Sequence, residues 1–207
     1  MAVKARLGIM GGVFDPPHIG HVALARAAIE ELGLERLLVL VVSDPGHKKT
    51  VAPIETRLEL TRLAFADVLQ TEVQLDRHAR TVDSLEELQP PPDSVFLLGA
   101  DELADLHTWK QPGRVLELVR LGVAMRPGVP DEQLRDARAR VPTPDRILIF
   151  EMEPQAVSSS GVRERVSRGE SIDDLVPPEV AREIARRGLY RKLGATLRRT
   201  VKGQSSN

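Results

Sequence analysis

The chain has 207 residues, a length that suits one domain with a core of its own. Its formal net charge of −1 argues against a protein that coats nucleic acid or an anionic membrane, and the absence of cysteine excludes disulfides and thiolate metal sites. No apolar run is long enough to span a membrane, and residues 1–10 lack the apolar region of a secretory signal, so we expect a cytoplasmic protein.

The first half of the chain alternates strand patterns with helix patterns. A short apolar run at 6–10 predicts a strand that ends at two glycines. Apolar residues at helical spacing predict a helix over Ile19–Leu32, with Gly33 as its stop signal. The apolar, β-branched run at 36–42 predicts a strand buried on both faces, as in a parallel sheet. The patterns that follow predict a polar loop over 43–49, helices over 54–69 and 81–88, and a weak strand over 72–75.

The second half continues this alternation and ends in a basic, polar tail. Its patterns predict a buried strand over 94–99, helical pieces over 101–106 and 112–119, strands over 122–128 and 146–150, a helix after Ser158–Ser160 and a closing helix over 177–188. We expect the tail at 194–207 to be disordered. Strands that alternate with helices imply right-handed crossovers, so the predicted fold class is α/β, a mostly parallel sheet with helices on both faces.

Polar clusters fall where these predicted strands end. They lie at 11–21, 43–49, 99–101 and 126–128, and a further cluster at 158–163 follows the last strand. Ligands of open parallel sheets bind outside the carboxyl ends of the strands. The clusters therefore predict one shared site.

The segment GGVFDPPHIGH at 11–21 has the residue types that phosphate binding requires. Gly11 and Gly12 allow backbone N–H groups to approach a ligand closely, and the helix N-terminus that follows attracts anions. His18 and His21 share the first helical turn, where two imidazoles can donate hydrogen bonds to a polyphosphate. Two alternatives stay open, because such a pair can also bind zinc or merely cap the helix.

This segment resembles the GGxFDPxHxGH signature of the nucleotidyltransferase superfamily with the (H/T)xGH motif. SSSGVRERV at 158–166 resembles the [ST]STxxR element of that superfamily. The stretch at 99–128 is similar to the GxDxLxxLxxW…RPG pattern of bacterial nicotinate-nucleotide adenylyltransferases, SDPGHKK resembles their PPHK loop, and RRGLYR at 186–191 resembles their ending. The similarity extends from residue 7 to about residue 191.

The resemblance implies a Rossmann-like nucleotidyltransferase domain over 1–193 with a helical C-terminal portion. It implies adenylyl transfer from ATP to nicotinate mononucleotide, a step of NAD biosynthesis that gives nicotinate adenine dinucleotide and pyrophosphate. Mg²⁺ is implied as a cofactor that bridges ATP phosphate oxygens. The expected partners are these small molecules, without nucleic acid or membrane, and a homo-oligomer is compatible with the sequence.

The resemblance also implies roles for particular residues. The implied catalytic residues are His18, His21 and Arg163. The implied ATP-binding residues are Gly11, Gly12, Phe14, His18, His21, Asp101, Ser159, Ser160 and Arg163. The implied acceptor-binding residues are His47, Lys48, Thr81 and Trp109, and no metal is expected on protein side chains. Structural alternatives exist for some of them, since Trp109 could anchor a core and Asp101 could cap a helix.

One loop departs from the family pattern R-x-G-P-S-Y-T-x-D-T-L. Here residues 76–85 read DRHARTVDSL, so the loop is shortened and Arg80 stands in the place of the tyrosine. We therefore expect Arg80 to influence the choice of acceptor. Three alternatives stay open: the same chemistry on nicotinamide mononucleotide, the same chemistry on another phosphorylated acceptor such as phosphopantetheine, and a non-catalytic nucleotide-binding module.

Overall fold

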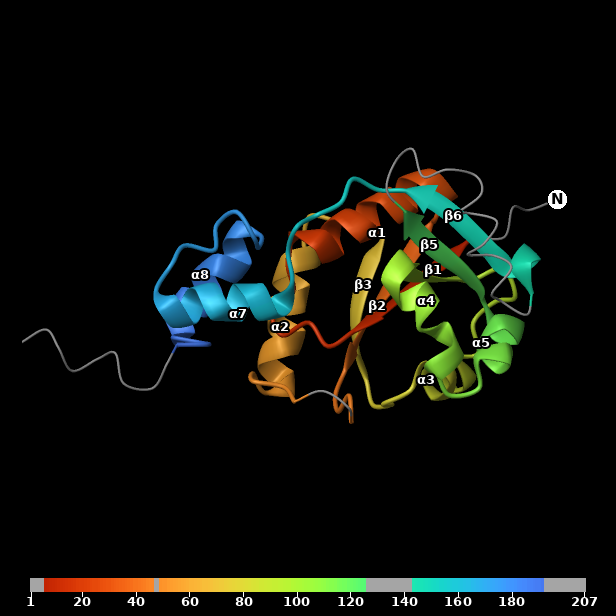
Figure 1. The fold of residues 1–207 in the computed structure, drawn as a ribbon, viewed down its shortest axis with the longest axis horizontal. Coiled ribbons are helices and arrows are strands. Elements are labelled where there is room, and N and C mark those ends of the chain that lie inside the picture. The colour runs from red at the N-terminus through yellow and green to blue at the C-terminus, as the bar shows by residue number, and fades with distance from the viewer. Residues whose placement is uncertain (1–5, 47–48, 126–142, 192–207) are drawn as a thin grey trace, which may run out of the picture.

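The computed structural model describes residues 6–46, 49–125 and 143–191, and these residues form a parallel sheet with helices on both faces (Figure 1). The strands are β1 (Leu7–Gly12), β2 (Arg36–Val42), β3 (Thr71–Asp76), β4 (Val95–Gly99), β5 (Arg120–Met125) and β6 (Ile147–Glu151). Their order in the sheet is β3-β2-β1-β4-β5-β6, and every neighbouring pair is parallel. The predicted fold class is confirmed.

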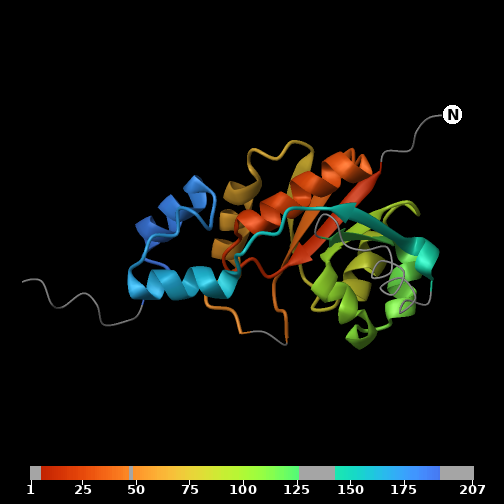
Figure 2. The same cartoon turned by 45° about the horizontal axis from the view of Figure 1, so that its top comes forward.

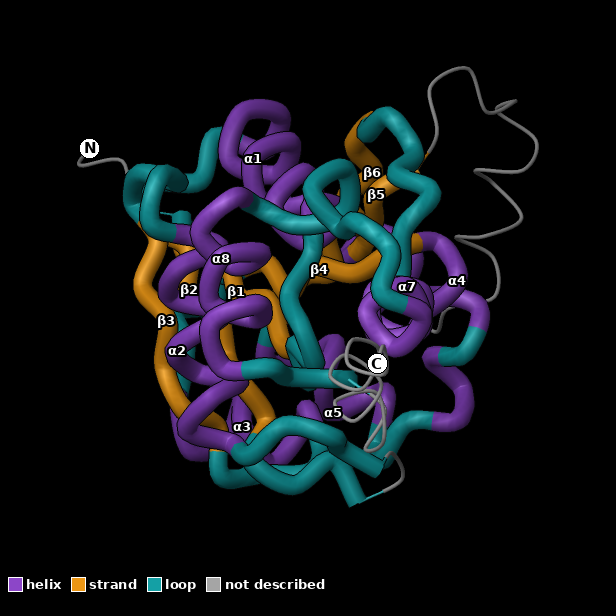
Figure 3. Tube along the Cα trace, turned by 90° about the vertical axis from the view of Figure 1, so that its left-hand side faces the viewer, coloured by secondary structure: helices purple, strands orange, loops and turns teal. Residues whose placement is uncertain are grey.

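The helices are α1 (Ile19–Leu32), α2 (Ile54–Phe65), α3 (Thr81–Leu88), α4 (Ala100–Ala104), α5 (Pro112–Leu118), α7 (Ser159–Arg168) and α8 (Pro178–Arg187). Short 3-10 turns lie at Leu106–Thr108 and Pro144–Arg146. Figure 2 shows α7 and α8 together at one side of the molecule, and in Figure 3 α8 lies in front of α2, which it contacts. The helix α8 therefore packs on α2, which in turn covers β2 and β3.

Successive residues of each central strand point to opposite faces of the sheet, so the molecule has two cores. Ile9 belongs to the core under α3, α4 and α5, whereas Met10 belongs to the core under α1, α2 and α8. In β2, Leu38 and Val39 divide in the same way. Both faces are buried, which explains why the central strands have continuous apolar sequences.

The sheet opens between β1 and β4, where the strand order reverses. These two strands pair only at Gly8 with Val95 and at Ile9 with Phe96, although both continue for several residues beyond. Their carboxyl ends are therefore not paired with each other. This is the place in a doubly wound sheet where ligands bind.

Several element boundaries differ from the prediction. β1 continues through both glycines because Gly12 still pairs with Val41 of β2. β5 begins before residue 122 because the N–H of Arg120 donates to the carbonyl of Ser94 and extends the ladder to β4. The helix predicted to reach residue 69 ends at Phe65, and Gln70 adopts a positive φ of 64°.

Some predictions fall on residues that the structure does not describe. They are His47 and Lys48, the cluster at 126–128 and the tail at 194–207, which all lie outside the described residues. Among the residues that are described, no helix has the length and apolar character needed to cross a membrane.

Candidate active site

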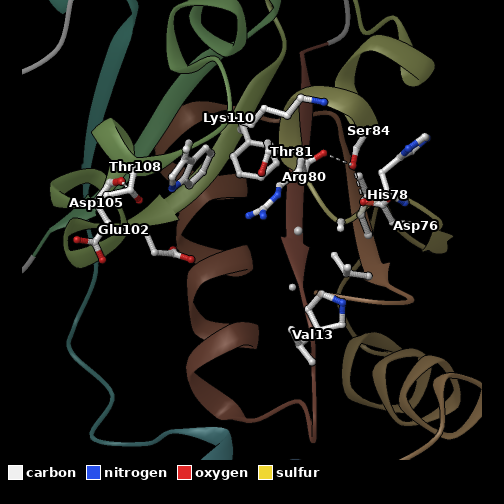
Figure 4. Close-up of a pocket in the computed structure, with 18 residues that line it drawn as sticks. Val13, Asp76, His78, Arg80, Thr81, Ser84, Glu102, Asp105, Thr108 and Lys110 are labelled. Carbon is white, nitrogen blue, oxygen red and sulfur yellow. Dashed lines mark hydrogen bonds between the residues drawn. The ribbon is translucent and has the colours of Figure 1, made fainter. Parts of the chain in front are cut away.

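A cavity of about 540 Å³ lies at the carboxyl ends of the central strands (Figure 4). It begins beside Gly11 and Gly12 of β1 and passes Phe96 of β4. Its other end is formed by the start of α3 and by Trp109, whose ring meets the ring of Phe96 edge-on at 5.9 Å between centroids. The opening between β1 and β4 therefore leads into a pocket with an aromatic wall.

The two histidines of the opening motif stack on each other at the start of α1. Their ring centroids are 3.6 Å apart, and the ring planes differ by 24°. The backbone N–H of His18, the N-cap residue, donates to Nδ1 of His21 at 3.1 Å. Because Nδ1 accepts this bond, the proton of a neutral His21 lies on Nε2. The capping alternative is thus partly correct, and it leaves the Nε2–H of His21 for a ligand.

Burial keeps both imidazoles uncharged near neutral pH. Loss of hydration lowers the pKa of His18 from 6.5 to about 4. The pKa of His21 is also lowered well below 6.5, first by burial and then by the neighbouring His18. Two neutral rings can stack closely, whereas two imidazolium ions would repel each other. The pair can therefore donate hydrogen bonds without carrying a charge.

We expect the free protein to lose stability as the pH falls from about 6.5 to about 4. In this window the histidines of the unfolded chain, with a pKa near 6.5, bind protons. His18 of the folded chain, with a pKa of about 4, does not yet bind one. The free energy of unfolding therefore decreases with falling pH, and above pH 6.5 this contribution is constant. Urea unfolding at a series of pH values measures the slope for the wild type and for the double variant His18→Gln/His21→Gln.

The double variant should show a shallower slope than the wild type between these pH values. His107→Gln is the matched control, because His107 is exposed and, among the described residues, its ring forms a hydrogen bond only with the nearby carbonyl of Ala104. An unchanged slope in the double variant would contradict the assignment of the lowered pKa values.

Asp15 joins the histidine loop to two distant segments. Its carboxylate is buried and accepts from the N–H of Val51 at 2.6 Å and of Ala52 at 3.2 Å. The hydroxyl of Tyr190 also donates to it, at 2.8 Å. Burial and the nearby Asp15 carboxylate raise the pKa of Tyr190, so its phenol remains protonated and can donate. Asp15 therefore fixes the loop before α1 against the chain that precedes α2 and against the C-terminal segment.

Arg57 of α2 holds the ends of β1 and β2 together. It is only 1% exposed. Its Nη1 donates to the carbonyls of Val13 and Val42, and its Nη2 donates to the carbonyl of Ser43, all at 2.7 Å. Nothing in the sequence pattern identified this role, because a buried arginine within a helix looks like an exposed one until its partners are known.

The second predicted motif lies against the first. The hydroxyl of Ser159 donates to the carbonyl of Pro16 at 2.8 Å, which ties the first turn of α7 to the histidine loop. Arg163 donates to the carbonyl of Asp15 at 2.6 Å and to the hydroxyl of Ser160 at 3.2 Å. The N-termini of α1 and α7 are thus joined, and two helix N-termini with an arginine are suited to a polyphosphate.

The structure places the other predicted residues as follows. Thr81 and Trp109 line the cavity, as do Gly11 and Gly12. The side chain of Phe14 is 2% exposed, and its ring centroid lies 4.9 Å from that of His21. The backbone of Phe14, with a φ of 50°, therefore shapes the turn, whereas its side chain is buried.

Asp101 is exposed in α4 and does not line the cavity, whereas its neighbour Glu102 does. Asp101 is not the N-cap either, since that position is Gly99.

The zinc alternative gains no support from the described part of the chain. No group of three or more His, Asp or Glu side chains there is arranged to hold a metal ion. Within these residues, His18 and His21 have each other, the Phe14 ring and the loop backbone as neighbours. The arrangement is suited to donating hydrogen bonds to an anion.

Comparison with known proteins gives consistent matches. Residues 9–165 match the family described as cytidylyltransferase-like. A "Probable nicotinate-nucleotide adenylyltransferase" of Thermomicrobium roseum is 40% identical over 204 residues, which cover 93% of this chain and 95% of that protein. A protein of the same name from Thermus thermophilus is 38% identical over 194 residues, covering 90% of this chain and 100% of the relative.

A solved structure has the same fold. The nicotinic acid mononucleotide adenylyltransferase of Plasmodium falciparum, complexed with NaAD, gives a TM-score of 0.69 and covers 89% of this chain and 97% of that chain. The two sequences are only 19% identical, so this likeness bears on the fold alone.

Proposed function

Because the chain belongs to the cytidylyltransferase-like family and, within it, to the nicotinate-nucleotide adenylyltransferases, we propose that it transfers the adenylyl group of ATP to nicotinate mononucleotide. The products are nicotinate adenine dinucleotide and pyrophosphate, so the reaction is a step of NAD biosynthesis. The observation that carries this proposal is the cavity that extends from the glycines beside the histidine loop to an aromatic wall.

The reaction needs no protein nucleophile. An oxygen of the acceptor's phosphate attacks the α-phosphorus of ATP, a new P–O bond forms, and the bond from the α-phosphorus to pyrophosphate breaks. The protein must align two polyanions and stabilise the charge that grows on the leaving pyrophosphate. Hydrogen-bond donors fixed in advance are worth most for this task, because they need no reorganisation during the reaction.

The two joined helix ends supply such donors. We assign His18 and His21 to the ATP phosphates, where the Nε2–H of His21 donates while Nδ1 is held by the His18 backbone. Arg163 lies against the same loop and adds a permanent positive charge. We assign Ser159 and Ser160, at the start of α7, to the β- and γ-phosphates through the helix N-terminus.

The remaining ATP contacts follow from the turn after β1. The absence of a side chain at Gly11 lets the nucleotide approach the end of the strand. Gly12 also lines the cavity, and a Cβ there would lie 2.8 Å from the ring of Phe14, so glycine is needed for the turn itself. The backbone of Phe14 shapes the turn, while its ring packs edge-on against the imidazole of His21. We place Asp101, exposed at the start of α4, towards the adenosine ribose.

Mg²⁺ enters this proposal with ATP. The described residues provide no cluster of carboxylates or imidazoles that would hold the ion by itself. An ion carried on phosphate oxygens and water would need no such cluster, and the hydrogen-bond donors near α1 and α7 would hold the phosphates of such a complex. The ion would neutralise phosphate charge, and the His and Arg donors would orient the phosphates.

We assign the aromatic end of the cavity to the acceptor. The indole of Trp109 is partly exposed there and can stack on a pyridine ring, with Thr81 nearby. His47 and Lys48, which lie outside the described residues and follow β2 in the sequence, are proposed to contact the acceptor as well. Trp109 also touches the core through Phe96, so the anchoring alternative describes part of its environment.

Pyrophosphate release tests the proposal directly. With ATP and Mg²⁺, we expect rapid release in the presence of nicotinate mononucleotide and much slower release with nicotinamide mononucleotide or phosphopantetheine. A preference for either of the other two acceptors would keep the mechanism and change the substrate. The absence of release with all three would favour the non-catalytic nucleotide-binding alternative.

A further inference from the structure

One cation that lines the cavity has no partner within the protein as far as it is described. Lys110 is paired with Asp83, its Nζ lying 2.7 Å from the carboxylate, and His78 is paired with Glu87. The guanidinium of Arg80 makes no hydrogen bond or ion pair with residues 6–46, 49–125 or 143–191. A guanidinium that lines a pocket and is not paired with a carboxylate there is suited to bind an anion.

The backbone of Arg80 is held in place, although its side chain is not. Arg80 is the N-cap residue of α3, and its carbonyl accepts from the N–H of Asp83 at 3.1 Å and of Ser84 at 3.2 Å. The hydroxyl of Ser84 bonds both to this carbonyl and to the buried carboxylate of Asp76. Asp76 also accepts from the N–H of His78, which closes the short loop. The guanidinium therefore extends from a fixed point.

The surroundings of Arg80 fit a flat ring that bears an acidic group. Figure 4 shows the guanidinium pointing into the pocket. Trp109 and Thr81 line the same pocket, and the N-terminus of α3 adds a partial positive charge. Glu102 and Asp105 also line it, and in Figure 4 they lie on the far side of the pocket from Ser84.

We propose that Arg80 binds the carboxylate of the nicotinate ring and thereby selects nicotinate over nicotinamide mononucleotide. This assignment rests on the proposed function. A guanidinium can form two parallel hydrogen bonds to a carboxylate, whereas a neutral carboxamide carries no charge and offers only one acceptor oxygen. The acceptor's phosphate belongs at the other end of the cavity, near Gly12 and the histidine loop, so the ring carboxylate is the anionic group left for Arg80.

The test compares the two acceptors in the wild type and in Arg80→Met, at saturating ATP and Mg²⁺. We expect kcat/KM for nicotinate mononucleotide to fall about 10- to 100-fold, mainly through KM, because a charge-assisted pair is lost. The value for nicotinamide mononucleotide should change little, so the ratio of the two should collapse. Arg80→Lys keeps the charge without the planar fork and should lose less. Arg77→Met is the matched control, since Arg77 is an exposed arginine of the same loop that does not line the cavity.

An unchanged ratio of the two kcat/KM values would overturn the proposal. If kcat/KM fell equally for both acceptors, Arg80 would act on the phosphate that they share. Titration calorimetry separates this outcome from a failure of the proposed function. If the wild type releases no pyrophosphate, the proposed function fails. Tighter binding of nicotinate than of nicotinamide mononucleotide to the wild type, lost in Arg80→Met, would still support the role of Arg80, and equal binding would refute it.

Discussion

Replacing His21 with alanine should lower kcat at least about a hundredfold, because it removes one fixed hydrogen-bond donor that we assign to the phosphates on which charge develops. His18→Ala should have an effect of similar size. The centroids of the two stacked rings are 3.6 Å apart, and we expect the rings to act together. The fold-loss of kcat in the double variant should therefore be smaller than the product of the two single fold-losses. Steady-state pyrophosphate release at saturating substrates gives these values.

The capping role of His21 must be separated from its proposed catalytic role. His21→Asn does so, because its amide oxygen can take the place of Nδ1 and accept from the His18 N–H, while nothing replaces Nε2. This variant should unfold near the wild-type temperature and still be as slow as His21→Ala. His107→Ala, at an exposed position, should keep full activity. Near-normal turnover in His21→Asn would mean that the ring matters only as a cap.

Arg57→Met should lower the free energy of unfolding by about 3 kcal/mol or more, the largest stability effect that we expect from one side chain. The methionine fills much of the same space but donates nothing. Three carbonyls, those of Val13, Val42 and Ser43, then lose their donors at the ends of β1 and β2. A loss of this size corresponds to a drop in Tm of roughly 10 °C for a chain of this length.

Urea unfolding measures this effect, and Arg62→Met is its matched control. Arg62 lies on the same helix, is exposed and makes no side-chain hydrogen bond within the described residues, so its loss should cost little. Arg57→Lys should fall between the two, because one ammonium group cannot reach all three carbonyls with the geometry of a guanidinium. A loss below 1 kcal/mol in Arg57→Met would show that water replaces the guanidinium.

The sequence predicts best where the signals are local. The helix over Ile19–Leu32 and its stop at Gly33 agree with the structure, because helical periodicity and a left-handed C-cap are properties of neighbouring residues. The strand at 36–42 agrees as well, since burial on both faces leaves a continuous apolar run. β3 has a weak pattern because it is an edge strand, and most of its side chains remain outside the core.

The site was predictable only in part, because several of its contacts join residues that are far apart in the chain. Short motifs indicated His18, His21, Ser159 and Arg163, and the structure brings the two motifs together. Asp15 was visible within a motif, but its bonds to Val51 and Ala52 depend on how the loop after β2 returns to the motif. The role of Arg57 depends on three carbonyls, which no periodicity describes.

The bond from Tyr190 to Asp15 has a consequence for the order in which the protein is made. It spans 175 positions of the chain, and the bond from Arg163 to the Asp15 carbonyl spans 148. A nascent chain that emerges from the ribosome N-terminus first exposes the opening motif long before either partner has been synthesised. A chain that has grown only through β6 can form the complete sheet, yet its Asp15 still lacks both partners. The first motif to be translated is therefore among the last parts of the enzyme to be completed.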